Sequence, residues 1–277
     1  MLRSYSRRIA RMTTAMPLLV TVAVSSLTSM GCESTPPPSN PLKYTEEAKK
    51  AYDEALEAFL DRDWEEARTL LNEVRRKYSF TKYARLAELR LADIDFEQEK
   101  FTSAITSYRT FSKDHRTDES VPYARYRICR ALVAQISDTV LLPPQEERDQ
   151  AATVDAYREL TAFVEDYPTS KWIAETRFML FDVTGRLVRH ELYVARYYLK
   201  QDRFEASARR VQYALRNYES SGLEPEALVL LAEIYLKMKK TTEAREVLNQ
   251  VVQVYPKSPF VVPAKRFLQE MNASATR

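Results

Sequence analysis

The sequence predicts an all-α fold, and three observations support this. The chain of 277 residues contains only three glycines, fewer than a fold with many β-hairpins or a phosphate-binding loop needs. Residues that favour helices are abundant, and apolar residues recur at three- and four-residue spacing, as in Ala48, Ala51, Tyr52, Ala55 and Phe59. A pattern of small and apolar residues also returns five times. We therefore expect a right-handed superhelical solenoid of about five helix hairpins.

The repeated pattern starts with an aromatic or polar residue at the turn between two helices. A small residue follows three positions later, and apolar residues follow four and seven positions after that. The small residues are Ala67, Ala104, Ala156, Ser207 and Ala244. Their spacings are 37, 52, 51 and 37 residues, so the middle repeat carries extra residues. This pattern resembles the tetratricopeptide family, whose period the short spacings approach.

Each position of the pattern has a physical role. The small residue lets the two helices of a hairpin approach closely, and apolar residues such as Leu71 and Val74 pack against the first helix and the next repeat. The preceding helices carry matching small residues at Ala55, Ala92, Ala195 and Ala232. Pro168 and Pro256 end the second helix of their repeats, because proline lacks the N–H that a helix needs.

The spacing places the helices approximately. We expect them near residues 45–60, 63–77, 82–98, 101–113, 119–137, 150–166, 170–200, 203–218, 224–238 and 241–254. Residues 44–137 would hold repeats 1 and 2 with the first helix of repeat 3. Residues 138–149 contain two consecutive prolines and form an expected irregular insertion. Residues 150–258 would complete repeats 3, 4 and 5, and residues 259–277 would form a capping tail.

The first 31 residues have the composition of a signal peptide. Four arginines precede the apolar segment Met16–Leu27, which is too short to span a bilayer comfortably. A glycine then precedes Cys32, while Ser29 and Met30 stand where the bacterial lipobox has leucine and a smaller residue. The segment resembles a lipoprotein signal, which implies cleavage before Cys32 and attachment of diacylglycerol and an N-acyl chain such as palmitate. An ordinary signal peptide is the alternative.

Cleavage before Cys32 would change the charge of the chain. The remaining 246 residues carry 38 basic and 39 acidic side chains, so no net positive field would attract nucleic acid. Contact with a membrane would come from the lipid anchor alone, with each buried CH₂ contributing about 0.8 kcal/mol. Glu33 stands where an aspartate would retain a lipoprotein at the inner membrane, so the resemblance implies the outer membrane. Residues 32–43 form an expected proline-rich, non-helical tether.

The sequence contains no pattern typical of catalysis. Its two histidines, His115 and His190, lie seventy-five residues apart with no nearby cysteine, which argues against a zinc site. Nucleotide-binding and nucleophile motifs are absent from the sequence. Cys129 is expected to be a small buried hydrophobe, with a reactive thiol as the alternative. We expect a non-enzymatic protein without a cofactor; an enzyme would instead need a polar pocket with perturbed titratable groups.

Two segments resemble the outer-membrane assembly factor BamD family. They are TAFVEDYPTSKW (161–172) and, after a long helix, HELYVARYYLKQDRFEASARRVQYALRNY (190–218). The family typically reads E-x-x-V-A-x-Y-Y in the second segment, which Glu191, Val194, Ala195, Tyr197 and Tyr198 match. Asp202-Arg203-Phe204 replaces its usual glycine-containing turn, and Arg209-Arg210 replaces its Asn-Arg pair.

This resemblance implies a non-enzymatic lipoprotein of the β-barrel assembly machinery, anchored at the periplasmic face of the outer membrane. The C-terminal repeats would bind the periplasmic domains of BamA, with Arg210 as the leading contact and Arg196 and Arg203 in support. An arginine suits this role because it can pair bidentately with a carboxylate. Solvated surface arginines are the alternative.

The same resemblance implies that the N-terminal repeats recognise unfolded outer-membrane clients, and that accessory lipoproteins bind the chain. Tyr83, Tyr123 and Tyr126 are the candidate residues of this peptide groove, with core packing as the alternative. A different tetratricopeptide lipoprotein, concerned with the cell wall or division, is the alternative function. It would have another partner and no effect on barrel assembly.

Overall fold

The computed structural model describes residues 40–136 and 143–275, and in these ranges it contains helices and no strand. The all-α prediction is therefore confirmed. The predicted signal peptide, Cys32, residues 33–39 of the tether and residues 138–142 of the insertion lie outside the described residues.

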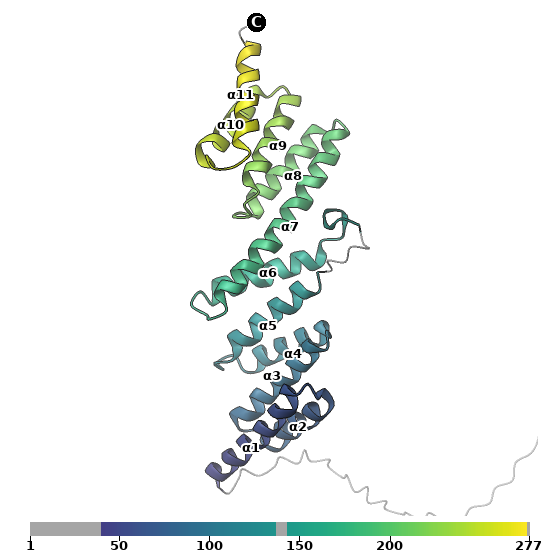
Figure 1. The fold of residues 1–277 in the computed structure, drawn as a ribbon, viewed down its shortest axis with the longest axis vertical. Helices are drawn as coiled ribbons and strands as arrows, with labels where there is room; N and C mark the ends of the chain where they lie inside the picture. Colours follow the sequence, from purple (N-terminus) through teal and green to yellow (C-terminus); the bar gives the residue numbers. More distant parts are fainter. Residues whose placement is uncertain (1–39, 137–142, 276–277) are drawn as a thin grey trace, which may run out of the picture. The chain divides into compact units, whose positions relative to one another are not determined.

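Eleven α-helices and one short 3-10 helix form the described part of the chain (Figure 1). In chain order they are α1 (Pro41–Leu60), α2 (Trp64–Lys77), α3 (Lys82–Glu97), α4 (Phe101–Asp114), α5 (Val121–Ala134), η1 (Gln145–Glu147), α6 (Ala151–Asp166), α7 (Ile173–Lys200), α8 (Phe204–Asn217), α9 (Glu224–Lys237), α10 (Thr241–Val254) and α11 (Val261–Ala275).

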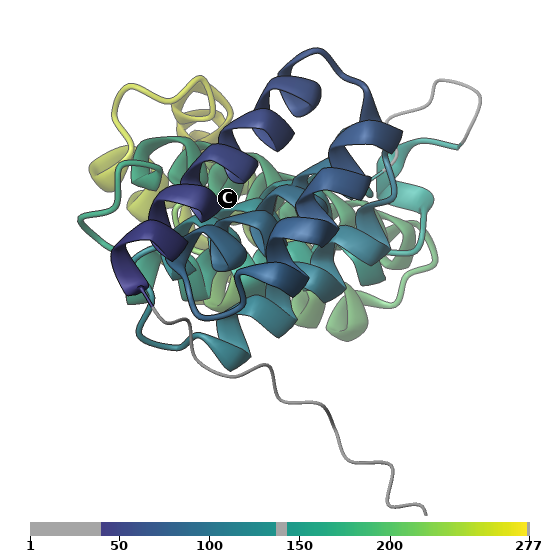
Figure 2. The same ribbon diagram turned by 90° about the horizontal axis from the view of Figure 1, so that it is seen from below.

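Each α-helix packs against the next one along the chain, which gives the hairpins α1/α2, α3/α4, α5/α6, α7/α8 and α9/α10. The first helices of successive hairpins also touch, as α1 does with α3 and α5 with α7. Figure 2 shows the same helices from below, with the hairpins stacked behind one another. The fold is a tetratricopeptide-like solenoid, as the sequence predicts.

The small residues meet where the two helices of a hairpin cross. All five residues at this position, and the five residues four places later, are 0% exposed: Ala67, Ala104, Ala156, Ser207, Ala244, Leu71, Tyr108, Leu160, Val211 and Leu248. In the fourth hairpin the Ser207 hydroxyl donates to the carbonyl of Ala195 at 2.7 Å, so the two small positions face each other directly. The predicted role of the small residue is confirmed there.

The structure adds helical residues at both ends of the predicted array, and at the N-terminal end it differs from the prediction. The sequence predicts a non-helical tether through residue 43, but α1 already begins at Pro41, with the Asn40 side chain accepting from the Lys43 N–H at 3.2 Å. Proline is tolerated at this position because the first N–H groups of a helix have no partner. The capping tail is the fifteen-residue helix α11, which packs against α10 and buries Ala264 completely.

The turns inside four hairpins have a feature that the spacing pattern does not indicate. Arg62, Glu99, Asp202 and Lys239 adopt positive φ angles between 54° and 61°, each five residues before the small residue of its repeat. Only glycine adopts this left-handed conformation without steric cost, which is about 1–2 kcal/mol for other residues. These turns therefore hold a modest strain that the packed hairpins tolerate.

Replacing Lys239 by glycine should relieve this strain. We expect Lys239→Gly to raise the free energy of unfolding by ~0.5–1 kcal/mol, because the left-handed penalty exceeds the extra unfolded-state entropy of glycine. The matched control is the neighbouring exposed Lys240, whose φ is −91°. Lys240→Gly should lower stability by ~0.5 kcal/mol in the same urea titration. Equal destabilisation by both substitutions would contradict the prediction.

Candidate protein-interaction site

The arginine predicted to lead partner binding lies between the two helices of the fourth hairpin. Arg210 on α8 pairs with Glu191 on α7 at 3.2 Å. The Glu191 side chain is only 9% exposed, whereas that of Arg210 is 44% exposed. A carboxylate so deeply buried needs a compensating charge. Arg210 therefore satisfies Glu191 and keeps part of its guanidinium open to solvent.

The two supporting arginines also interact within the solenoid. Arg196 on α7 forms an ion pair with Glu226 on α9, which links the fourth and fifth hairpins. Arg203, the residue before α8, places its guanidinium over the ring of Tyr198 at 4.9 Å. The structure thus places Arg196 on the second half of α7 and gives Arg210 and Arg203 contacts with residues there. Each still has exposed surface, because Arg196 is 45% exposed and Arg203 lies in an exposed turn.

The three tyrosines predicted for an N-terminal groove have different environments. Tyr83 on α3 is half-buried, with its ring 5.8 Å from that of Tyr52. Tyr126 on α5 is 4% exposed, stacks on Trp172 at 5.4 Å, and donates to Glu175 at 2.6 Å. The prediction that Tyr126 lines an open groove is wrong, because Trp172 folds over it from a distant part of the sequence. The core-packing alternative holds for this residue.

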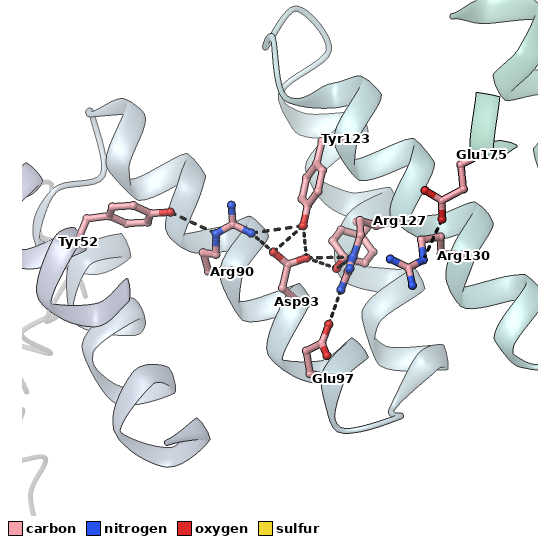
Figure 3. A network of polar contacts seen from close by, with 9 residues as sticks. Tyr52, Arg90, Asp93, Glu97, Tyr123, Arg127, Arg130 and Glu175 are labelled. Atoms are coloured by element: carbon pink, nitrogen blue, oxygen red, sulfur yellow. Dashed lines mark hydrogen bonds and ion pairs between the residues drawn. The ribbon is translucent and has the colours of Figure 1, made fainter. Parts of the chain in front are cut away.

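Tyr123, the third predicted tyrosine, belongs to a buried polar network centred on Asp93 (Figure 3). Asp93 on α3 is 1% exposed, and both its carboxylate oxygens accept from the Tyr123 hydroxyl, at 2.8 and 2.9 Å. Arg90 and Tyr108 also donate to this carboxylate, and the Arg127 guanidinium approaches it at 3.3 Å. Burial, reinforced by the negative charge of Asp93, raises the pKa of Tyr123 to about 12.

The network extends from the first hairpin to the third. Arg90 donates to the Tyr52 hydroxyl on α1 at 3.3 Å. Arg127 on α5 donates to Glu97 at 3.2 Å and lies 3.9 Å above the ring of Phe96, both at the end of α3. Polar and ionic contacts therefore join the first helices of three successive repeats. Residue spacing does not predict this network, although charged residues at positions 90 and 93 interrupt the apolar stretch of α3.

The two histidines, the acidic groups and Cys129 of the described chain are the candidates for a metal site or a reactive thiol. In the part of the chain that the structure describes, no three His, Cys, Asp or Glu side chains gather closely enough to hold a metal ion. His115 lies 2.9 Å from Glu88, and His190 lies 2.7 Å from the carbonyl of Glu146. Cys129 is fully buried, which raises the pKa of its thiol. No described helix is both long enough and apolar enough to cross a bilayer.

These features define a class of protein: a helical-repeat protein with partly exposed arginine side chains on its C-terminal hairpins. A family model described as "YfiO: Outer membrane lipoprotein" matches residues 45–249. The chain belongs to this family, which also comprises the assembly factors called BamD.

Curated relatives with that name align over most of the chain. The outer membrane protein assembly factor BamD of Neisseria meningitidis serogroup A is 26% identical over 78% of this chain and 82% of its own length. That of Caulobacter vibrioides is 28% identical, covering 76% of this chain and 67% of its own. That of Vibrio cholerae is 22% identical, covering 82% of this chain and 93% of its own.

Solved structures of tetratricopeptide proteins also align with the chain. A thermophilic TPR protein from Thermus thermophilus has a TM-score of 0.33 and 16% identity, covering 80% of this chain and 99% of its own. The TPR2AB domain of yeast Sti1 has a TM-score of 0.40 and 12% identity, covering 81% of this chain and 85% of its own.

Removing the centre of the buried network should destabilise the protein. We expect Asp93→Ala to lower the free energy of unfolding by about 2–4 kcal/mol, because Arg90 would lose its carboxylate partner and the buried Arg127 would keep only Glu97. Asp53→Ala is the control, since Asp53 pairs with Lys49 on the exposed face of α1 and should lose less than about 0.5 kcal/mol. Similar losses in urea denaturation for both variants would contradict this role.

Proposed function

We propose that this protein is a non-enzymatic scaffold of the β-barrel assembly machinery that binds BamA and unfolded outer-membrane clients. The observation that carries this proposal is the family match over residues 45–249, which runs from α1 into α10. Curated relatives aligned over most of the same length are outer membrane protein assembly factors. The proposal places the protein at the periplasmic face of the outer membrane, anchored through Cys32.

In this proposal, the C-terminal hairpins bind BamA through Arg210. Its side chain is 44% exposed while it holds the buried carboxylate of Glu191. A guanidinium has five N–H donors in a planar fork, and the hydrogen bond to Glu191 comes from one nitrogen, so a carboxylate of the partner can share the group. Arg196 and Arg203 support this contact from α7 and from the turn before α8. An anchor already fixed by Glu191 loses little side-chain entropy on binding.

The proposal assigns client recognition to the N-terminal hairpins, with Tyr83 as the remaining candidate for an accessible aromatic contact. Its ring is half-buried against Tyr52, so it presents one surface in a fixed orientation. Tyr123 acts instead through Asp93 by fixing α5 against α3. The network would keep the surface of these first helices rigid while an extended segment binds.

The BamA contact can be tested by affinity purification of membrane-extracted protein from its own host. We expect wild type to recover BamA and Arg210→Glu to lose it, because the new carboxylate would repel both Glu191 and the acidic partner group. Arg209→Glu is the matched control on the same helix, since Arg209 is exposed and has no ion pair in the described structure. This control should retain BamA.

Other outcomes would count against the proposal in distinct ways. Loss of BamA with both variants would indicate a general effect of charge and not a contact at Arg210. Absence of BamA from the wild-type sample would contradict the assembly function itself and favour a scaffold with another partner. Circular dichroism of each variant should remain helical, which separates lost binding from lost folding.

The lipid anchor has its own test. We expect wild type to incorporate labelled palmitate and to sediment with outer membranes, and Cys32→Ser to abolish both, because serine lacks the thiol that accepts diacylglycerol. Cys129→Ser is the control, since Cys129 is fully buried and available to no acyl donor. Unchanged labelling of Cys32→Ser would contradict anchoring at this residue.

A further inference from the structure

The first hairpin has two edges, which differ in charge. Its helices α1 and α2 pack side by side and run in opposite directions, so the start of α1 lies beside the end of α2 (Figure 2). The Tyr44 hydroxyl donates to the carbonyl of Lys77 at 2.7 Å, and the Tyr44 ring lies 5.2 Å from that of Tyr78. These contacts place residues 40–47 and 73–82 together at one edge. Residues 53–66 form the opposite edge, around the turn between the two helices.

The first of these edges is basic and the second is acidic. Residues 40–47 and 73–82, which we call the basic edge, carry five basic and three acidic side chains. Residues 53–66, the acidic edge, carry seven acidic side chains and one basic one. The cations of the basic edge are all exposed: Lys43, Arg75, Arg76, Lys77 and Lys82. Arg75 and Arg76 have no ion pair or hydrogen bond in the described part of the chain.

The charge preference of helix ends does not account for this separation. Cations at the C-terminus of α2 and acids at its N-terminus do suit the helix macrodipole. In α1 the arrangement is the reverse, because Glu57 lies in the last turn and Asp61 is the C-cap, where negative charge is unfavourable. The two helices therefore share a charge pattern that follows the edges of the hairpin and not the direction of each helix.

Exposed apolar side chains accompany the cations of the basic edge. Leu42, in the first turn of α1, is 79% exposed, and Phe80, between α2 and α3, is 70% exposed. Lysines and arginines interspersed with exposed apolar side chains are typical of surfaces that lie against anionic lipid headgroups. The long basic side chains reach the phosphates while the apolar ones enter the headgroup region.

The predicted anchor lies close to the basic edge along the chain. Eight residue steps separate Cys32 from Asn40, and α1 begins at Pro41. Even a fully extended chain of that length spans only about 29 Å. An acylated Cys32 would therefore hold the basic edge within that distance of the membrane, whereas the hairpins that follow are under no such restriction. The chemistry of the nearest surface, a sheet of lipid phosphates, is complementary to the charge of this edge.

We propose that the basic edge lies on the anionic headgroup surface of the membrane that holds the Cys32 anchor, with Leu42 and Phe80 in the headgroup region. The acidic edge would then point toward the aqueous side, because the same phosphates repel it. Acyl chains retain the protein but leave it free to turn about the tether, so the basic edge would set the orientation of the solenoid. The proposal rests on the lipid anchor proposed above, and it adds a contact that the net charge of the chain does not indicate.

The test uses the mature lipidated protein in vesicles that contain a lipid with a spin-labelled headgroup. Ser79→Cys places a fluorescent label beside Phe80, and Thr242→Cys places it on the exposed start of α10 as the control. Acylated Cys32 and buried Cys129 leave the new cysteine as the labelled one. In phosphatidylethanolamine with about a third phosphatidylglycerol, we expect quenching at residue 79 to exceed that at residue 242 at least twofold. The difference should disappear in phosphatidylcholine, and at about 1 M salt, where the Debye length is about 3 Å.

Matched variants, each carrying the label at residue 79, decide which side chains make the contact. Arg75→Gln with Arg76→Gln should reduce quenching at least twofold. Lys239→Gln with Lys240→Gln removes the same charge from the exposed turn before α10 and should leave quenching unchanged.

The apolar contact has a matched pair of its own. Phe80→Ser should reduce quenching of the same label, whereas Phe178→Ser should not, because Phe178 is similarly exposed but lies on α7. All the substituted side chains are exposed, so every variant should keep the helical circular dichroism of the wild type.

The outcomes separate this proposal from the anchor on which it rests. Wild type that does not float with the vesicles would contradict the anchor, and the proposal with it. Flotation with equal quenching at residues 79 and 242 would overturn the basic edge alone. Quenching that ignores lipid charge and salt, or that the arginine and lysine pairs change equally, would also overturn it, and would leave the edge to an acidic protein partner.

Discussion

The close approach of two helices at a pair of small residues is the constraint on which the rest of this structure depends. In the fourth hairpin the Ser207 hydroxyl reaches the carbonyl of Ala195 at 2.7 Å, a contact that a larger side chain at either position would prevent. This approach brings the residues four and seven positions later into the core, where Val211 and Ala214 are at most 1% exposed. A hairpin so formed still has an uncovered apolar face, and stacking against the next hairpin buries it.

The hairpins are joined by two kinds of polar contact, with different consequences. In the N-terminal half, Asp93 is 1% exposed and fixes Tyr123, together with the first helices of neighbouring repeats, in a polar network with a buried centre. Such a network is costly to disrupt, so it favours a single arrangement of these repeats. In the C-terminal half, Arg210 and Arg196 remain nearly half exposed in their ion pairs. The exposed part of each guanidinium is open to a further carboxylate while its own ion pair stays intact.

The length of α7 determines how the C-terminal surface is arranged. Its second half packs with α8 and α9 and carries Glu191, the partner of Arg210. Its first half packs with α5 and α6 through one face and leaves Phe178 and Phe181 uncovered on another. The insertion before α6 also returns to this helix, where the Glu146 carbonyl lies 2.7 Å from His190. One continuous helix therefore links both halves of the solenoid.

The sequence by itself determined the fold class, the five hairpins and the family, because small and apolar residues at fixed spacing are local properties of each repeat. It also placed most helix ends within a few residues. At the start of α1, a proline that was expected to keep the chain non-helical begins the helix instead. The capping tail forms the helix α11. Only the tertiary structure decided that Trp172 covers Tyr126, that Asp93 gathers donors from α3, α4 and α5, and that two phenylalanines of α7 lie past its covering helices. Each of these depends on which side chains from distant segments meet, and residue spacing within one segment carries no information about that.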